Sequence, residues 1–172
     1  MATQVRVSLQ EYLETSYHPD REYVDGEVRE RNVGKWEHAR LQAMLAAWFA
    51  GHEAEWNVMV STEQRTAVSR QRVRVPDLVV VASEPQPDVI QKPPVLVVEI
   101  LSPDDTYSDL EERVADYRGM GVKAIWAIDP KTRTGRMCIG DDWKSARRLE
   151  VPETPIFVEL DELFSYLNRP RP

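Results

Sequence analysis

The amino-acid sequence predicts an α/β fold in which helices flank a mixed β-sheet. Residues 95–101 (VLVVEIL) and 123–129 (KAIWAID) are apolar runs of strand length, typical of strands that are buried on both faces. Between them, residues 108–118 have the spacing of an amphipathic helix, so the three segments resemble a βαβ unit with a right-handed crossover. A longer helical pattern over residues 36–52 supplies a second helix to cover the sheet.

The N-terminal part begins with two short elements. Ser8-Leu-Gln-Glu11 fits a capping box, so we expect a helix to begin near Ser8. Residues 22–29 have the pattern of a β-hairpin that turns at Asp25-Gly26. In the helix over residues 36–52, Gly51 is expected near the C-terminal end.

The later elements follow from apolar runs, capping signals and turn residues. A second capping box, Ser108-Asp-Leu-Glu111, opens the helix that Gly119 and Gly121 end. Pro76 is expected to break or bulge one strand, because proline lacks the N–H that a strand needs. The remaining strands are expected over residues 56–62, 71–82, 136–139 and 143–151, and a final helix over residues 159–167.

Length and composition bound the class of protein. The 172 residues suffice for one domain, which we expect over residues 1–172, with a core at about 8–165 and a frayed tail at 168–172. The sequence has no signal-peptide pattern and no apolar run of membrane-spanning length, which favours a cytoplasmic protein without a membrane partner. A single cysteine, Cys138, excludes an internal disulfide and a thiolate metal cluster.

The net charge of −7 argues against a protein that coats nucleic acid through bulk charge. It does not exclude a nuclease, because a metal-dependent site is itself acidic and DNA contact needs only a local basic patch.

Two carboxylates carry the strongest chemical signal. Asp77 follows Pro76 and precedes an apolar run, and Glu99 lies inside VLVVEIL. An ionised carboxylate in an apolar strand is costly unless it is paired or binds metal. On neighbouring strands, Asp77 and Glu99 could hold one Mg²⁺, with Mn²⁺ as a substitute, while water and phosphate complete the coordination. Alternatively, Asp77 could accept a backbone N–H bond and Glu99 could pair with a buried arginine.

The joint pattern of motifs resembles the Uma-type restriction endonuclease family, which is common in cyanobacteria and belongs to the PD-(D/E)xK nuclease superfamily. The resemblance covers about residues 8–165. Its motifs are Tyr23-Val-Asp-Gly-Glu27, Pro76-Asp77, Val97-Val-Glu-Ile-Leu-Ser-Pro103, Asp109-Leu-x-x-Arg113-x-x-x-Tyr117 and Ala124-Ile-Trp-Ala-Ile-Asp-Pro130.

The resemblance implies a restriction-endonuclease-like fold and a set of site residues. Asp77 and Glu99 would bind the metal, with the backbone carbonyl of Ile100 as a further ligand. Glu27 resembles the family's N-terminal Gly-Glu acid, and Glu37 is a competing candidate for that outer position. Glu27 could also be a solvated hairpin residue. The superfamily likeness further implies a homodimer, in which two sites cut two strands.

Arg113 departs from the family pattern. The superfamily lysine would fall at Leu101, and in the Uma-type family it has moved to the helix position that Arg113 holds here. Arginine can stabilise phosphate charge, but it stays protonated and cannot act as a general base. An i,i+4 pair with Asp109 is the structural alternative. Lys123 is a weaker candidate for the missing lysine.

Nucleic-acid contacts are less clearly marked. Arg70, Arg72 and Arg74 alternate, so a strand here would present one cationic face that leads to Asp77. A charged edge strand that resists aggregation explains the same pattern. None of the three histidines has a partner at ligand spacing, which argues against zinc.

The sequence therefore predicts a Mg²⁺-dependent endonuclease that hydrolyses DNA phosphodiester bonds. The alternative is a catalytically degenerate nuclease-fold protein that binds nucleic acid or a protein partner, because Arg113 replaces the expected lysine. A third reading is a structural domain in which Glu99 and Arg113 form a buried salt bridge.

Overall fold

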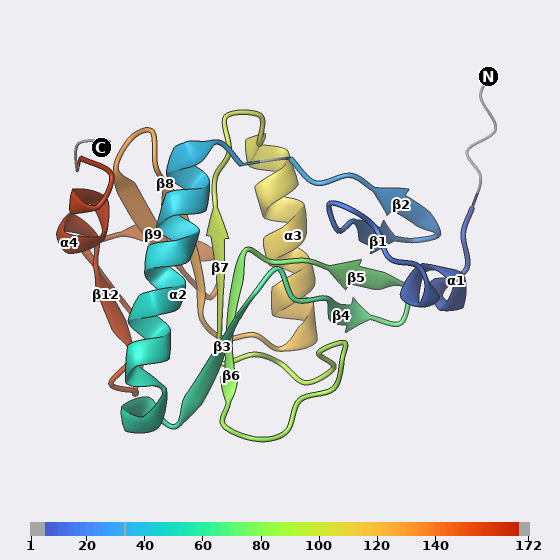
Figure 1. The fold of residues 1–172 in the computed structure, drawn as a ribbon, viewed down its shortest axis with the longest axis horizontal. Helices are drawn as coiled ribbons and strands as arrows, with labels where there is room; N and C mark the ends of the chain where they lie inside the picture. The colour runs from blue at the N-terminus through green and yellow to red at the C-terminus, as the bar shows by residue number, and fades with distance from the viewer. Residues whose placement is uncertain (1–5, 33, 169–172) are drawn as a thin grey trace.

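A six-stranded mixed sheet forms the centre of the fold (Figure 1). The computed structural model describes residues 6–32 and 34–168. The strand order is β10-β9-β8-β7-β6-β3; β7 and β8 are parallel and the other neighbours are antiparallel. The strands are β3 (Val58–Thr62), β6 (Leu78–Ala82), β7 (Leu96–Ile100), β8 (Ile125–Asp129), β9 (Thr134–Ile139) and β10 (Asp142–Ser145).

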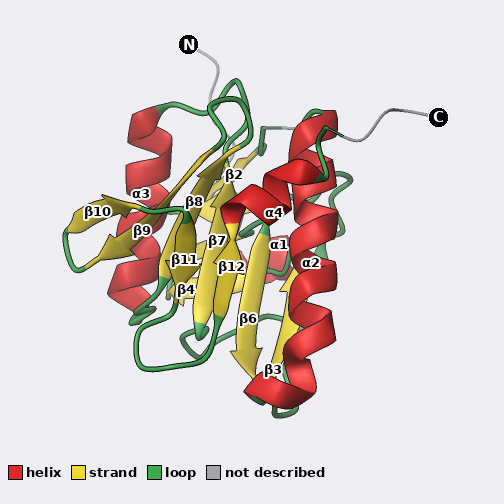
Figure 2. Ribbon diagram, turned by 90° about the vertical axis from the view of Figure 1, so that its left-hand side faces the viewer, coloured by secondary structure: helices red, strands yellow, loops and turns green. Residues whose placement is uncertain are grey.

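Helices cover both faces of this sheet. Figure 2 shows α3 (Tyr107–Met120) on one face and α2 (Trp36–Trp56) with α4 (Leu160–Ser165) on the other. In β7, Leu96, Val98 and Ile100 pack in the cluster that contains α2 and α4, whereas Val97 packs in the cluster that contains α3. Since side chains alternate along a strand, Glu99 faces α3. The predicted β7-α3-β8 unit and the mixed α/β architecture are confirmed.

A smaller sheet lies beside the central one. Its order is β2-β1-β5-β4. The strands are β1 (Glu22–Val24), β2 (Glu27–Arg29), β4 (Thr66–Ser69) and β5 (Arg72–Arg74), and α1 (Leu9–Glu14) precedes them. The predicted hairpin is present, and both turn residues, Asp25 and Gly26, have positive φ as a tight hairpin turn requires. A third sheet pairs β11 (Arg148–Glu150) with β12 (Phe157–Glu159).

Two of the predicted helix boundaries are wrong. The N-cap of α3 is Thr106, whose hydroxyl accepts the N–H of Asp109 while the Asp109 carboxylate accepts the N–H of Thr106. The capping box therefore begins at Thr106, in the pattern Thr106-x-x-Asp109, and not two residues later at Ser108. Helix α2 continues past Gly51 and ends at Asn57, which is left-handed.

Two predicted strands are each divided in the structure. Residues 71–82 form β5 and β6, which belong to different sheets and are separated at Pro76 and Asp77. Residues 143–151 likewise divide into β10 and β11. The final helix is shorter than predicted. The predicted tail falls largely on residues 169–172, which lie outside the described residues.

The described helices include none whose length and apolar character would let it cross a membrane.

Candidate active site

A small polar cavity of about 170 Å³ lies where the smaller sheet meets α3 and the ends of β6 and β7. Asp77, Glu99, Ile100 and Arg113, which the sequence singled out, all line it. The other lining residues are Glu22, Arg29, Glu30, Arg31, Asn32, His38, Arg74, Val75, Asp105, Asp109 and Glu112.

Asp77 lies in the break between β5 and β6, and its side chain is almost fully buried. One carboxylate oxygen, Oδ2, accepts the backbone N–H of Ile100 at 2.7 Å. The other oxygen, Oδ1, is 2.9 Å from Nη2 of Arg31 and 3.3 Å from Nε2 of His38. The carboxylate therefore joins the start of β6 to the end of β7, directly beside Glu99.

Glu99 is buried on the face of β7 that α3 covers. The hydroxyl of Tyr117 donates to Oε1 at 2.6 Å, and Nε of Arg113 lies 3.1 Å from Oε2. Burial raises the pKa of Glu99 to about 7; Arg113 opposes this rise and the charge of Asp77 adds to it. The carboxylate therefore lies in a site where a further cation would favour its ionised form.

Arg113 reaches into the cavity. Its Nη2 is 3.3 Å from Oδ1 of Asp105, in addition to its contact with Glu99. Its buried Nε–H makes no well-aligned hydrogen bond to the described residues, although Oε2 of Glu99 is at ion-pair distance. The alternative pairing with Asp109 does not form, because Asp109 caps α3. The ion pair between Glu99 and Arg113 is present, as the third interpretation, a purely structural domain, predicts.

Neither Glu27 nor Glu37, the two candidates for an outer acid, lines the small cavity. Glu27 is partly exposed and contacts Arg29, and Glu37 pairs with Arg133 at 3.2 Å outside the small cavity. Glu22 instead lines the cavity and is buried. It lies one strand before the Gly26-Glu27 pair. All three residues of β1, Glu22 among them, are buried.

Sequence reasoning also missed Arg31 and His38. His38 is buried, and its contact with Asp77 raises the pKa of its imidazole although burial alone lowers it. A signal was available, because positions 38, 41, 45 and 49 form one apolar stripe on α2 with His38 at its start. Arg31 lies in the loop before α2, where no periodicity indicates which side chains turn inward.

The arginines before Asp77 do not form a free cationic face. Arg70 lies exposed in the turn between β4 and β5. Arg72 contacts Asp116 of α3 at 3.0 Å, and Arg74 is buried against the same residue. The inner face of β5 therefore meets acidic residues of α3 instead of solvent, and Arg74 is not exposed for DNA. Lys123, the weaker candidate for the missing lysine, lies away from Glu99 along the strand direction. Ala127 of β8 is the register partner of Glu99, and Lys123 comes four residues before Ala127, which is about 13 Å along an extended chain.

Comparison with known proteins identifies the family. The family model Uma2, described as "Putative restriction endonuclease", matches residues 9–165. The chain belongs to the Uma2 family. No curated protein matches it.

Two solved structures are similar to this Uma2 chain. A crystal structure of a putative nuclease belonging to DUF820 from Anabaena variabilis ATCC 29413 matches with a TM-score of 0.82 and 20% identity, covering 94% of this chain and 99% of that one. At this identity the match shows the fold, which is the predicted nuclease-like mixed α/β fold. The DrdV–DNA complex matches with a TM-score of 0.43 and 16% identity, over 78% of this chain and 11% of that one.

The lining of the Uma2 cavity suits a hard divalent cation. Seven acidic residues and four arginines line it, and Asp77, Glu22 and Glu99 each pair with one of these arginines. The described residues contain no group of three or more Asp, Glu, His or Cys side chains that could hold a metal alone. Mg²⁺ does not require one, because it commonly binds through one or two carboxylates together with water and phosphate. Asp77 and Glu99 are therefore carboxylates of the type that Mg²⁺ binds, and each of their oxygens already contacts a donor or a cation of the protein.

Proposed function

We propose that this Uma2 protein is a Mg²⁺-dependent endonuclease that hydrolyses DNA phosphodiester bonds. The observation that supports it best is the convergence of Asp77 and Glu99, two buried carboxylates from different strands, on one polar cavity. Asp77 is bonded to the backbone of the residue that follows Glu99, which fixes the two groups relative to each other.

Each residue of the site has a role in this proposal. Asp77, Glu99 and the backbone carbonyl of Ile100 would hold Mg²⁺ or Mn²⁺. When bound, the ion polarises a phosphoryl oxygen and lowers the pKa of the attacking water. Arg113 stabilises charge on the phosphate, because its guanidinium is always protonated. Tyr117 orients Glu99 through the hydrogen bond at 2.6 Å.

A second candidate is a nuclease-fold protein that binds nucleic acid without cutting it. One observation favours it: each oxygen of Asp77 and Glu99 is already within contact distance of a donor or a cation. Arg113 also cannot act as a general base.

A cleavage assay separates the two candidates. The wild type should cut supercoiled plasmid with Mg²⁺ or Mn²⁺, and Asp77→Ala and Glu99→Ala should each abolish cutting, because either change removes a metal carboxylate. Lys92→Ala, which alters an exposed ion pair, serves as the control. If the wild type is inactive with both metals and Arg113→Lys gains activity, the degenerate protein is the correct reading.

The same assay tests the expected homodimer. Two sites acting together on one plasmid should give linear product directly, whereas one site should give nicked circles first. Light scattering of the free protein should give twice the mass of the chain if it dimerises without DNA.

A further inference from the structure

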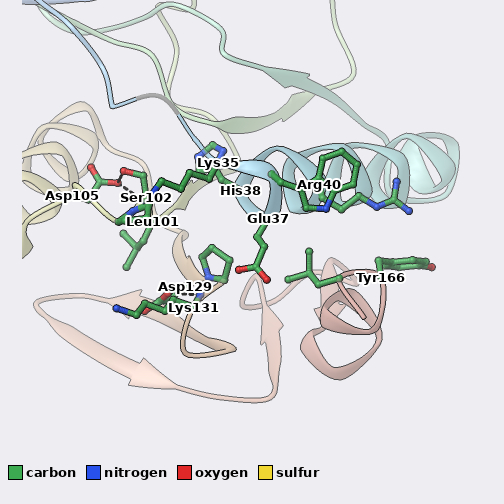
Figure 3. A pocket seen from close by; sticks show the side chains of 14 residues that line it. Lys35, Glu37, His38, Arg40, Leu101, Ser102, Asp105, Asp129, Lys131 and Tyr166 are labelled. Carbon is green, nitrogen blue, oxygen red and sulfur yellow. Dashed lines mark hydrogen bonds between the residues drawn. The ribbon is translucent and has the colours of Figure 1, made fainter. Parts of the chain in front are cut away.

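A second, larger pocket of about 1000 Å³ opens beside the candidate active site. We call it the side pocket; Figure 3 shows it from close by. Four segments surround it: the start of α2, the loop of residues 101–105 after β7, the turn of residues 129–131 after β8, and residues 166–167 after α4. His38 and Asp105 line both cavities, so the two are neighbours.

The charge that the side pocket offers to a ligand is positive. Two of its three acidic residues pair with arginines, Glu37 with Arg133 and Asp105 with Arg113. Asp129 accepts backbone N–H groups of its own turn and has no cationic partner among the described residues. By contrast, Lys35, Arg40 and Lys131 form no ion pair with the described residues. Lys35 and Lys131 lie on different walls of the pocket (Figure 3).

The side pocket also has an apolar and aromatic lining. Trp36 is 59% exposed at its edge, and Leu101, Pro103, Pro130 and Leu167 contribute apolar surface. A cationic rim around aromatic and apolar surface is the combination that holds unpaired nucleic-acid strands, since the cations contact phosphates and the rings stack on bases. A base within a duplex must leave its stack before it can enter such a pocket.

We propose that the side pocket binds an unpaired nucleotide of the DNA strand whose phosphate lies at Asp77 and Glu99. This inference rests on the proposed function and specifies its substrate: DNA with a single-stranded segment, such as a gap, a flap or a free strand. Lys35 and Lys131 hold the phosphates on either side of the nucleotide, and Trp36 stacks on its base.

Binding of labelled oligonucleotides tests this proposal. Fluorescence anisotropy in EDTA compares a 15-nucleotide strand with the same sequence as a duplex. The wild type should bind the single strand at least tenfold more tightly. Lys35→Ala combined with Lys131→Ala should weaken that binding at least tenfold and reduce the salt slope of log K by about 1.4, since each lost phosphate contact removes about 0.7 for a single strand.

The matched control is Lys92→Ala combined with Lys144→Ala, which removes two exposed lysines that line neither cavity. It should bind like the wild type. Trp36→Phe, a mild change at an exposed position, should remove the quenching of tryptophan fluorescence that the single strand causes. The proposal would be overturned if the wild type bound duplex and single strand equally tightly. It would also be overturned if the control double variant lost as much single-strand affinity as Lys35→Ala combined with Lys131→Ala.

Failure of this inference is distinguishable from failure of the proposed function. If the wild type cuts DNA in an Asp77-dependent way but the side-pocket variants bind and cut normally, only the inference fails. If no DNA is cut with either metal while single-strand binding depends on Lys35 and Lys131, the nuclease activity fails and the binding site is supported.

Discussion

At the scale of single residues, the site is set by how each buried charge is compensated. Asp77 accepts a backbone N–H and faces the guanidinium of Arg31 and the imidazole of His38, whereas Glu99 faces one hydroxyl and one guanidinium. The pKa of Glu99 is raised because this compensation does not fully offset its burial. A metal ion between the two carboxylates would supply the missing positive charge.

Glu22 gives the sharpest residue-scale prediction. Its carboxylate pairs with Arg74 at 2.7 Å and accepts the N–H of Val75 at 3.1 Å, so it is held against the cavity. We expect Glu22→Gln to lower the cleavage rate about 10- to 100-fold, as loss of a supporting group around a metal site commonly does. Glu27→Gln, which alters a partly exposed hairpin residue, should change the rate less than twofold.

Plasmid cleavage rates at saturating Mg²⁺ check this, with thermal melting to confirm that both variants fold. A larger loss in Glu27→Gln than in Glu22→Gln would favour Glu27, the residue that the sequence predicts.

The sequence identified the residues that interrupt apolar strands and missed Glu22, Arg31 and His38, which lie in a short strand, a loop and the start of a helix. Asp77 and Glu99 were found because a carboxylate in an apolar run is costly. Glu22, by contrast, follows charged residues in the sequence, so nothing local marks it as buried. Arg31 lies in a loop and contacts Asp77, a residue far along the chain, and no local spacing encodes that contact.

At the scale of elements, α3 carries much of the site. Two of its residues, Arg113 and Tyr117, contact Glu99, and they lie four positions apart on one helix face. The sequence predicted this helix correctly. Its start was misplaced because two capping patterns overlap, and only the structure decides between Thr106 and Ser108.

Removing the cap of α3 should loosen the helix that supports Glu99. We expect Thr106→Ala to destabilise the protein by about 1 kcal/mol, since it removes the hydroxyl that accepts the N–H of Asp109. Thr106→Ser should restore the stability. Ser8→Ala removes the corresponding cap of α1 and serves as the matched control.

Urea unfolding measures the loss, and hydrogen exchange locates it. Faster exchange should appear at residues 107–110 in Thr106→Ala and at the start of α1 in Ser8→Ala. Unchanged exchange at residues 107–110 would mean that packing, not the cap, holds the start of α3.

At the scale of the whole molecule, the candidate site lies at a junction. The central sheet supplies Glu99, α3 supplies Arg113 and the smaller sheet supplies Glu22. The sequence predicted the central sheet, because its strands are apolar and β7-α3-β8 is a local unit. It could not predict how the smaller sheet packs, since that contact depends on ion pairs between segments far apart in the chain.

Arg74 is the central residue of that junction. Its guanidinium lies 2.7 Å from Glu22, 2.6 Å from Asp116 and 3.1 Å from Glu112, and its side chain is 3% exposed. It thus joins β5 and β1 of the smaller sheet to α3. Removing one partner of a buried ionic cluster leaves the other charges uncompensated, which costs more than the pairing itself gains.

We therefore expect Arg74→Ala to destabilise the protein by about 3–5 kcal/mol. Arg74→Met should be similarly harmful, because it restores volume but leaves Glu22 and Asp116 without their cation. Lys92→Ala breaks an ion pair whose side chains are 80% and 44% exposed, so it should cost no more than about 1 kcal/mol. Urea unfolding of the three variants measures these differences. A loss in Arg74→Ala no larger than in Lys92→Ala would mean that apolar packing alone joins the smaller sheet to α3, and that the site does not depend on this ionic cluster for its shape.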